Sequence, residues 1–209
     1  MKDSFKLIQQ SIEISSENLI GFKKKEEFEK TLFHLKSLIL SSKMLLENKF
    51  FTQSLFLTIT AIEEIAKIEV CVTRGFENRE LSKRSKDPLF NHKSKHFMSA
   101  NPVMLVGDRL HKSIGENRVN QIFKELQDGE FVQIRENCLY FQRNNNSLLL
   151  PDEIIDVKLA FEMLLISIEM VDDKFWGLTA VASVISDELN DIYINIEKDM
   201  NKNYLQHRI

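Results

Sequence analysis

Glycine and proline are scarce in this chain, and their scarcity limits the folds that it can adopt. Of 209 residues, six are Gly and three are Pro, where average usage of about 7% and 5% would give roughly 25. These two residues supply the unusual and the fixed φ angles that tight turns need. A chain so poor in them is a weak candidate for a β-sandwich, a barrel or a many-stranded meander. Long helices are the natural alternative.

The glycine-rich loops that bind phosphate groups are also missing from the sequence. Neither G-x-G-x-x-G nor G-x-x-x-x-G-K-[ST] occurs in the chain. Both loops need glycine where the backbone closely approaches a phosphate group. The commonest nucleotide-binding folds are therefore excluded.

Length and charge favour a single domain over residues 1–209, without an overall attraction to polyanions. Lys and Arg total 28 and Asp and Glu total 31, so the formal net charge is −3. This balance gives the whole molecule no electrostatic attraction to nucleic acid or acidic lipid, although a local basic patch is still possible. Hydrophobic residues make up 43% of the chain and include 15 Phe, which indicates a large apolar core.

The sequence has neither a recognisable secretory signal nor a candidate membrane span. The richest apolar segment, 159–171, is interrupted by Glu162 and Glu169, and a span needs about 20 apolar residues. Cys71 and Cys138 lie far apart and form no C-x-x-C pair, as is typical of reduced core thiols. We expect a cytoplasmic protein without a membrane partner.

Apolar spacing predicts an all-α fold of five to eight helices. The densest stripe, within 50–73, repeats every three or four residues, which is typical of a buried helix at the centre of a bundle. A short connection at 47–49 predicts that this helix pairs antiparallel with the one before it. The remaining segments follow the same pattern. Helices are expected over 4–20, 28–47, 50–73, 103–113, 117–128, 130–142 and 152–200 (kinked or divided at Gly177), a mobile connection over 75–88, a polar loop over 143–147 and a frayed tail over 201–209.

Charged residues interrupt the densest helix in the segment AIEEIAK (61–67). Glu63 and Lys67 are four residues apart, and Glu64 and Lys67 are three apart, so either pair can touch on one helix face. One interpretation is an exposed ion pair, which contributes little to stability. The other is a functional cluster, because the apolar neighbours leave little surface for unused charge.

A second cluster of charge lies in HKSKH (92–96). Helical spacing would bring His92 and His96 to one face, but the Glu of H-E-x-x-H is missing and Lys93 and Lys95 would repel a cation. We therefore expect no metal and no other cofactor. Imidazole and ammonium groups suit an anion such as an RNA phosphate, while the alternative is a solvated basic stretch.

A third candidate lies in RENCLYF (135–141). The sequence places Arg135 on a largely apolar helix and Tyr140 toward the same end of that segment. Arg135 could clamp a phosphate with help from the Tyr140 hydroxyl. The alternative is a capping or salt-bridging arginine beside a core tyrosine.

These three motifs, in this order and at these separations, resemble those of the AbiV family of bacterial abortive-infection proteins, within the HEPN superfamily. The resemblance runs from about Leu32 to about Ile168. It implies an antiparallel four-helix bundle core with additional helices, and a homodimer whose site lies where two protomers meet. It also implies metal-independent RNA cleavage by an Arg followed four to six residues later by His. No His follows Arg135 in that window.

The resemblance leads to two hypotheses about function. In the first, the chain is an anti-phage effector, a metal-independent ribonuclease that leaves 2′,3′-cyclic phosphate ends or a toxin that blocks translation. Its candidate catalytic residues are Glu63, Glu64, His92, Arg135 and Tyr140, and its candidate RNA-binding residues are Lys67, Lys93, Lys95 and His96. In the second, the bundle arrests growth without catalysis, by docking onto a host or phage protein, and the same charges form a buried structural network. A phage or host protein is the expected trigger.

Overall fold

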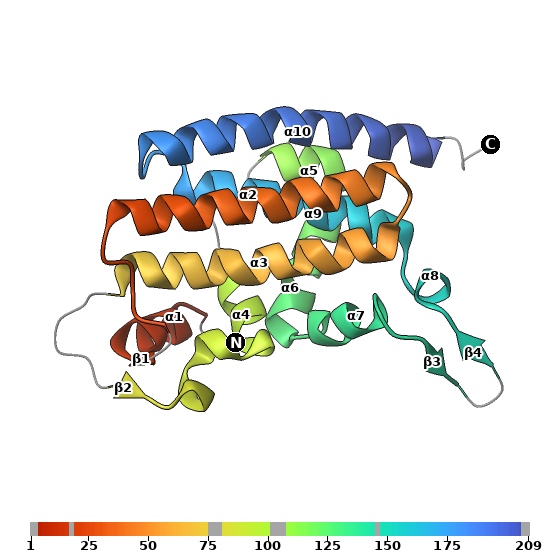
Figure 1. Cartoon of the computed structure of the whole chain (residues 1–209). Helices are drawn as coiled ribbons and strands as arrows, with labels where there is room; N and C mark the ends of the chain where they lie inside the picture. Colours follow the sequence, from red (N-terminus) through yellow and green to blue (C-terminus); the bar gives the residue numbers. More distant parts are fainter. Residues whose placement is uncertain (1–3, 17–18, 75–80, 101–107, 145–146, 206–209) are drawn as a thin grey trace.

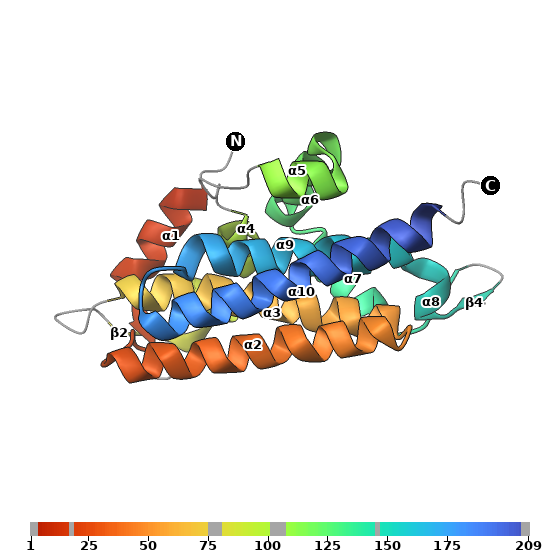
Figure 2. The same ribbon diagram turned by 90° about the horizontal axis from the view of Figure 1, so that it is seen from above.

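Four long helices form the core of the computed structural model, which describes residues 4–16, 19–74, 81–100, 108–144 and 147–205. They are α2 (Lys25–Glu47), α3 (Phe51–Thr73), α9 (Val157–Phe175) and α10 (Ala180–Leu205). Short connections make α2 and α3 one antiparallel pair and α9 and α10 another, and the two pairs pack against each other (Figures 1 and 2). The all-α fold predicted from the sequence is confirmed.

The apolar stripes predicted from the sequence face the inside of this bundle. Leu55, Ile59 and Ile62 of α3 are fully buried. Helix α9 is buried along most of its length, from Leu159 to Val171, because α3 and α10 both pack against it. Such burial removes large apolar areas from water, which is the main driving force for folding.

Shorter helices cover one side of the bundle. They are α1 (Ser4–Glu13), α4 (His92–Ser99), α5 (Asp108–Ile114), α6 (Glu116–Asp128), α7 (Phe131–Asn137) and α8 (Pro151–Ile154), with the 3₁₀ helices η1 (Arg84–Lys86) and η2 (Pro88–Phe90). Helix α4 packs on α3 and on α6, and α7 packs on both α3 and α4. Figure 1 shows α1, α4 and α7 lying below α3.

Two pairs of very short strands complete the described part of the chain. Strand β1 (Ser15–Ser16) pairs parallel with β2 (Leu81–Ser82), with Ser15 opposite Leu81. Strand β3 (Gln142–Arg143) pairs antiparallel with β4 (Leu148–Leu149), with Gln142 opposite Leu149. The β3–β4 hairpin projects away from the bundle (Figure 1).

Several predicted helix boundaries are wrong. The helix expected over 4–20 ends at Glu13, because the Arg74 side chain binds the backbone oxygens of Ser11 and Leu19 and redirects the chain. The helix expected over 130–142 ends at Asn137, where the chain turns into the β3–β4 hairpin.

The long segment expected over 152–200 is three helices, and Gly177, with φ of 81°, lies in the connection that separates α9 from α10. Helix α10 continues to Leu205, so the tail expected to fray from 201 is helical at least that far. The expected helix over 103–113 begins at Asp108 in the described residues. The predictions for 75–80, 101–107 and 206–209 lie outside them, and the connection after residue 80 contains β2, η1 and η2.

Candidate functional site

A buried carboxylate, Glu63, forms the centre of the candidate site. It lies midway along α3, and its side chain is 3% exposed. Helix α4 brings three donors to it, because residues 92, 95 and 96 share one helix face. His92 Nδ1 lies 2.8 Å from both carboxylate oxygens, Lys95 Nζ 2.5 Å from Oε2, and His96 Nε2 3.0 Å from Oε1.

These donors keep Glu63 ionised despite its burial. Burial alone would raise the pKa of the carboxyl, but hydrogen bonds from His96 and Lys95 and the charge of both groups outweigh it and lower the pKa to about 2. Burial lowers the pKa of Lys95, against the opposing effect of Glu63. Glu63 is therefore an anion throughout the physiological pH range.

His92 connects the buried carboxylate to the surface. Its side chain is 45% exposed, and its Nδ1 donates to Glu63, which leaves Nε2 as the unprotonated nitrogen of the neutral ring. No described residue hydrogen-bonds this Nε2. A carboxylate that fixes the tautomer of an accessible imidazole is the arrangement of a general base.

Lys95 and His96 have a different environment, inside the molecule. The Lys95 side chain is 6% exposed and that of His96 is fully buried. His96 also contacts the Phe131 ring edge-on, with 6.5 Å between ring centroids. Its buried Nδ1 has no hydrogen-bond partner among the described residues. Lys95 therefore supplies a counter-charge, and both groups hold Glu63 from within by hydrogen bonds.

Arg135, on α7, approaches the same carboxylate from another direction. Its Nε lies 3.8 Å from Glu63 Oε1, and its guanidinium stacks over the Phe56 ring at 4.7 Å. The side chain is 20% exposed, and Nη1 lies 3.5 Å from Glu136. Stacking fixes the guanidinium plane while its remaining N–H groups stay near the surface, as phosphate binding requires.

The other candidate residues are not part of this cluster. Of the two pairs that the spacing allowed, the structure forms Glu64 with Lys67, and Glu63 contacts α4 instead. Glu64 and Lys67 both lie close enough to Lys95 to influence its pKa. Tyr140 is 61% exposed, beyond the end of α7, and has no described contact with Arg135. Lys93 is exposed and lies over Gly129, where an added Cβ would approach Lys93 Cγ to 2.7 Å.

Two supporting residues were not found from the sequence. The Asn91 side chain accepts a hydrogen bond from Ser94 N and caps α4, and asparagine before a helix is a recognisable signal for this role. Phe56 stacks under Arg135, but its spacing in the sequence does not distinguish it from the apolar core residues of the same helix.

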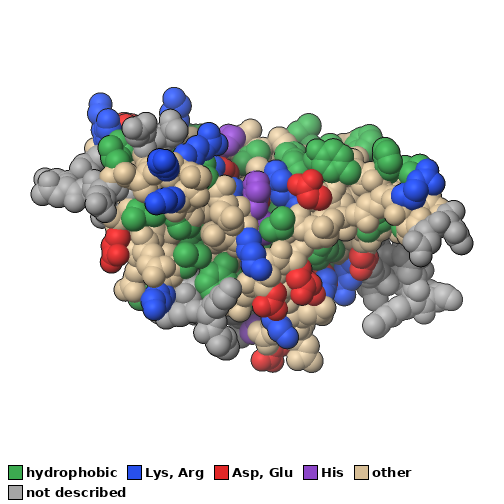
Figure 3. Space-filling view, turned by 90° about the horizontal axis from the view of Figure 1, so that it is seen from below, with side chains coloured by type: hydrophobic (Ala, Val, Ile, Leu, Met, Phe, Trp, Pro, Cys, Tyr) green, Lys and Arg blue, Asp and Glu red, His purple; other side chains and the backbone are tan. Residues whose placement is uncertain are grey.

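Exposed basic side chains precede α4 in the chain. Figure 3 shows Lys and Arg side chains most densely at one end of the lower face, with further Lys and Arg scattered across the rest of it and hydrophobic side chains gathered toward the other end. The exposed basic residues of η1 and the segment around it are Lys83, Arg84 and Lys86, and η1 packs on η2, which contacts α4. The Arg84 guanidinium lies 4.4 Å above the Phe90 ring.

No group of three or more His, Cys, Asp or Glu residues in the described part could hold a metal ion. Two cavities of about 270 and 560 Å³ open elsewhere on the bundle, and neither is lined by Glu63 or its partners. None of the described helices is both long enough and apolar enough to cross a bilayer. The Glu63 cluster itself consists of imidazole, ammonium, guanidinium and carboxylate groups from α3, α4 and α7, and its carboxylate is buried.

Comparison with known proteins gives one family. A family model described as AbiV matches residues 25–172, which include α2, α3, the whole Glu63 cluster and most of α9. No curated protein and no solved structure matches the chain significantly.

Proposed function

The chain belongs to the AbiV family of HEPN abortive-infection proteins, and from this membership and the Glu63 cluster we propose that it is an anti-phage effector that cleaves RNA without a metal ion. The observation that carries the proposal is the pair formed by buried Glu63 and half-exposed His92. This action would take place in the cytoplasm.

In the proposed reaction, His92 Nε2 takes the proton from an RNA 2′-hydroxyl, and the 2′-oxygen attacks the adjacent phosphorus. The bond from phosphorus to the 5′-oxygen then breaks, and that oxygen receives a proton from the imidazolium or from water. The products are a 2′,3′-cyclic phosphate and a 5′-hydroxyl. Glu63 stabilises the imidazolium that forms during the first transfer.

Arg135 supplies positive charge to the same step. Negative charge builds up on the phosphoryl oxygens as the 2′-oxygen attacks, and a fixed guanidinium stabilises it more effectively than a mobile one. The stacking of Arg135 on Phe56 provides that fixed position. Lys93 and the exposed basic residues of η1 would hold the flanking phosphates.

The roles proposed for the remaining candidates differ from those first expected. Lys95 and His96 would act indirectly, by keeping Glu63 ionised and in place, because both are buried. Glu64 is paired with Lys67, so His92 is the better candidate for the general base. Tyr140 would contact RNA beyond the cleaved bond.

The test is cleavage of total RNA by the purified chain in EDTA, with detection of 2′,3′-cyclic phosphate ends. His92→Gln and Arg135→Ala should each lower cleavage by about 10²-fold or more, and toxicity in cells should fall with it. Lys36→Gln, far from the cluster on α2 and paired with Glu188, is the control and should cleave normally. Cleavage that survives both site substitutions would contradict the mechanism.

A second candidate function is a binding module that arrests growth by docking onto a host or phage protein. It is favoured by exposed apolar side chains on and beside the β3–β4 hairpin, namely Leu139, Tyr140, Phe141, Leu148 and Leu150. Toxicity that persists in His92→Gln and is lost on polar substitution of the hairpin would favour this function, including a block of translation without cleavage.

The same hairpin is our candidate for the contact between two copies in a homodimer. A two-stranded hairpin is marginally stable alone in water, and this one presents Phe141 at 66% exposure. In light scattering after size exclusion, the wild type should have the mass of a dimer, and Phe141→Ser with Leu148→Ser should give a folded monomer. A wild-type monomer would contradict this assembly.

A further inference from the structure

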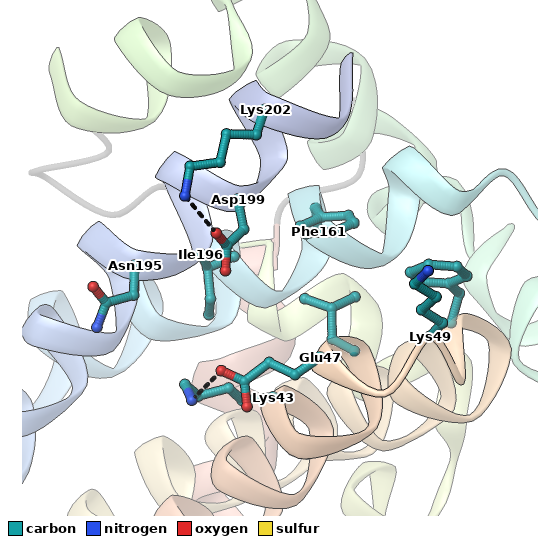
Figure 4. Close-up of a pocket in the computed structure, with 10 residues that line it drawn as sticks. Lys43, Glu47, Lys49, Phe161, Asn195, Ile196, Asp199 and Lys202 are labelled. Carbon is teal, nitrogen blue, oxygen red and sulfur yellow. Dashed lines mark hydrogen bonds and ion pairs between the residues drawn. The ribbon is translucent and has the colours of Figure 1, made fainter. Parts of the chain in front are cut away.

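The smaller of the two cavities is lined by both polar and apolar residues and lies at the end of the bundle where α2 turns into α3. It has a volume of about 270 Å³ and is bounded by the end of α2, the start of α3, and parts of α9 and α10 (Figure 4). None of the residues of the Glu63 cluster lines it. It is therefore independent of the proposed catalytic site.

The inner wall of this cavity is apolar and partly aromatic. Leu46, Phe51, Phe161 and Ile196 form it. The rings of Phe51 and Phe161 lie 6.2 Å apart between centroids, tilted by 39°. Flat apolar groups pack well against such rings, and aromatic contacts of this kind add to the energy of burial alone.

Lysine side chains dominate the rim. Lys43 is paired with Glu47 at 2.5 Å, and Lys202 with Asp199 at 3.6 Å (Figure 4). For Lys49, which also lines the cavity, the described residues provide no carboxylate partner. The rim therefore offers one positive charge that is not already neutralised.

The backbone of Lys49 is strained where it reaches the cavity. Its φ of 66° is the one positive value found at a non-glycine residue in the described ranges. Glycine or asparagine usually occupies this position after a helix, because a Cβ there is unfavourable. Hydrogen bonds from Lys49 N to Leu46 O and from Phe50 N to Leu45 O close this turn at the end of α2, and the turn fixes the backbone from which the Lys49 side chain reaches the cavity.

We propose that this cavity binds a small organic anion with a flat apolar body, that is, an aromatic carboxylate or an aromatic phosphate. The apolar body would lie against Phe51 and Phe161, and the anionic group would accept hydrogen bonds from Lys49 Nζ. The volume is just below the usual range of about 300–1,000 Å³ for drug-sized ligands, and a single unpaired ammonium does not suit a triphosphate. A ligand here would bridge four helices and stabilise the folded state by mass action.

The test is calorimetric titration of the full chain with four probes: phenyl phosphate, benzoate, benzyl alcohol and inorganic phosphate. At least one aromatic anion should bind with a stoichiometry of one per chain. Benzyl alcohol lacks the charge and inorganic phosphate lacks the apolar body, so each should bind at least about tenfold more weakly. The two aromatic anions separate the carboxylate from the phosphate as the preferred group.

Matched lysine variants locate the site. Lys49→Met should weaken binding of the aromatic anion at least about tenfold, whereas Lys30→Met, at an exposed lysine of α2 outside the cavity, should leave it unchanged. Thermal unfolding confirms that both variants are folded. His92→Gln should bind the probe like wild type, which separates this proposal from the catalytic one. No binding of either aromatic anion at millimolar concentration, or equal binding by Lys49→Met and wild type, would overturn the proposal.

Discussion

At the scale of single residues, Glu63 determines the electrostatics of the candidate site. One buried carboxylate accepts hydrogen bonds from two buried cationic or imidazole groups and one surface imidazole. A buried pair of this kind costs little while complete, but it becomes very unfavourable when one partner is removed. The stability of the protein and the orientation of His92 therefore depend on the same atoms.

Replacing Glu63 tests this dependence. Glu63→Gln should lower the free energy of unfolding by about 3–5 kcal/mol, because Lys95 stays buried without its counter-charge. Urea denaturation at neutral pH measures the change. Glu64→Gln, at the adjacent but part-exposed ion pair, should change stability by about 0.5 kcal/mol or less.

The double variant makes the interpretation specific. Glu63→Gln combined with Lys95→Met removes both charges, so it should recover much of the stability lost by Glu63→Gln alone. If the single Glu63 variant is as stable as the Glu64 variant, the buried network does not have the energetic role assigned to it.

The strained backbone of Lys49 leads to a prediction of the opposite sign. Lys49→Gly should raise the free energy of unfolding by about 1 kcal/mol, because glycine adopts a φ of 66° without a Cβ clash. Asn48→Gly is the control, since φ is −89° there and glycine should be destabilising. Chemical denaturation compares the two, and a loss of stability in Lys49→Gly would show that the conformation is not strained.

At the scale of elements, a second buried ion pair joins the short helices to the bundle. Arg74 caps the end of α3 and donates to both oxygens of Asp87, while Asp87 also accepts from Leu89 N in η2. Gly21 packs so tightly against this region that an added Cβ would lie 1.7 Å from the Arg74 oxygen. Because α4 follows η2 directly, the position of His92 depends on this pair.

Asp87→Asn tests that connection. It keeps the size of the side chain but removes its charge, and we expect a loss of about 3 kcal/mol or more because Arg74 is fully buried. Hydrogen exchange should increase in α1 and α4 first, before the central α3. Glu47→Gln removes an exposed ion pair on α2 and should leave hydrogen exchange unchanged. If Asp87→Asn increases hydrogen exchange equally in all helices, the Arg74–Asp87 pair does not act locally on α1 and α4.

The sequence predicts the bounds of a helix well where the residues of that helix determine them. It predicts them poorly where a residue distant in the sequence determines where the helix ends. The stripes of α2 and α3 predict both helices closely, because their burial follows from local spacing. The early end of α1 depends on Arg74, which is about 60 positions away. Such a contact leaves no local signal.

The candidate site shows the same division. Helical spacing correctly groups His92, Lys95 and His96 on one face, but it does not reveal that this face packs against Glu63. Lysine is usually exposed, so Lys95 was expected at the RNA surface instead of in the interior. Tyr140 was expected beside Arg135, and the end of α7 at Asn137 separates their environments.

At the scale of the whole molecule, two buried glutamates should give stability a particular dependence on pH. The pKa of Glu63 is depressed from 4.5 to about 2, so its contribution is present above pH 4.5 and is lost as pH falls from there toward 2. This difference corresponds to at most about 3 kcal/mol. Burial raises the pKa of Glu169 despite its pairing with Arg109, so its contribution has the opposite sign and is lost as pH rises through its folded-state pKa.

The free energy of unfolding should therefore be highest in mildly acidic solution and should fall below pH 4.5. Denaturant titrations from pH 7 to about 2.5 measure this profile. Glu63→Gln should remove most of the fall at low pH, and Glu169→Gln should flatten the change at higher pH. If the free energy of unfolding falls equally below pH 4.5 in wild type and in Glu63→Gln, Glu63 is not the cause of that fall.

The spread of the Glu63 cluster along the chain has a consequence for biosynthesis. Helices α2 and α3 are adjacent in sequence, so their contacts with each other can form soon after both are synthesised. Glu63 meets its α4 partners across 29 to 33 residues, and it meets Arg135 later still. Helix α9, which packs on the other side of α3, is made after all of them. Because chains fold from the N-terminus during synthesis, a partly made copy would carry no assembled site. Under the proposed function, a cell would be exposed to RNA cleavage only from finished molecules.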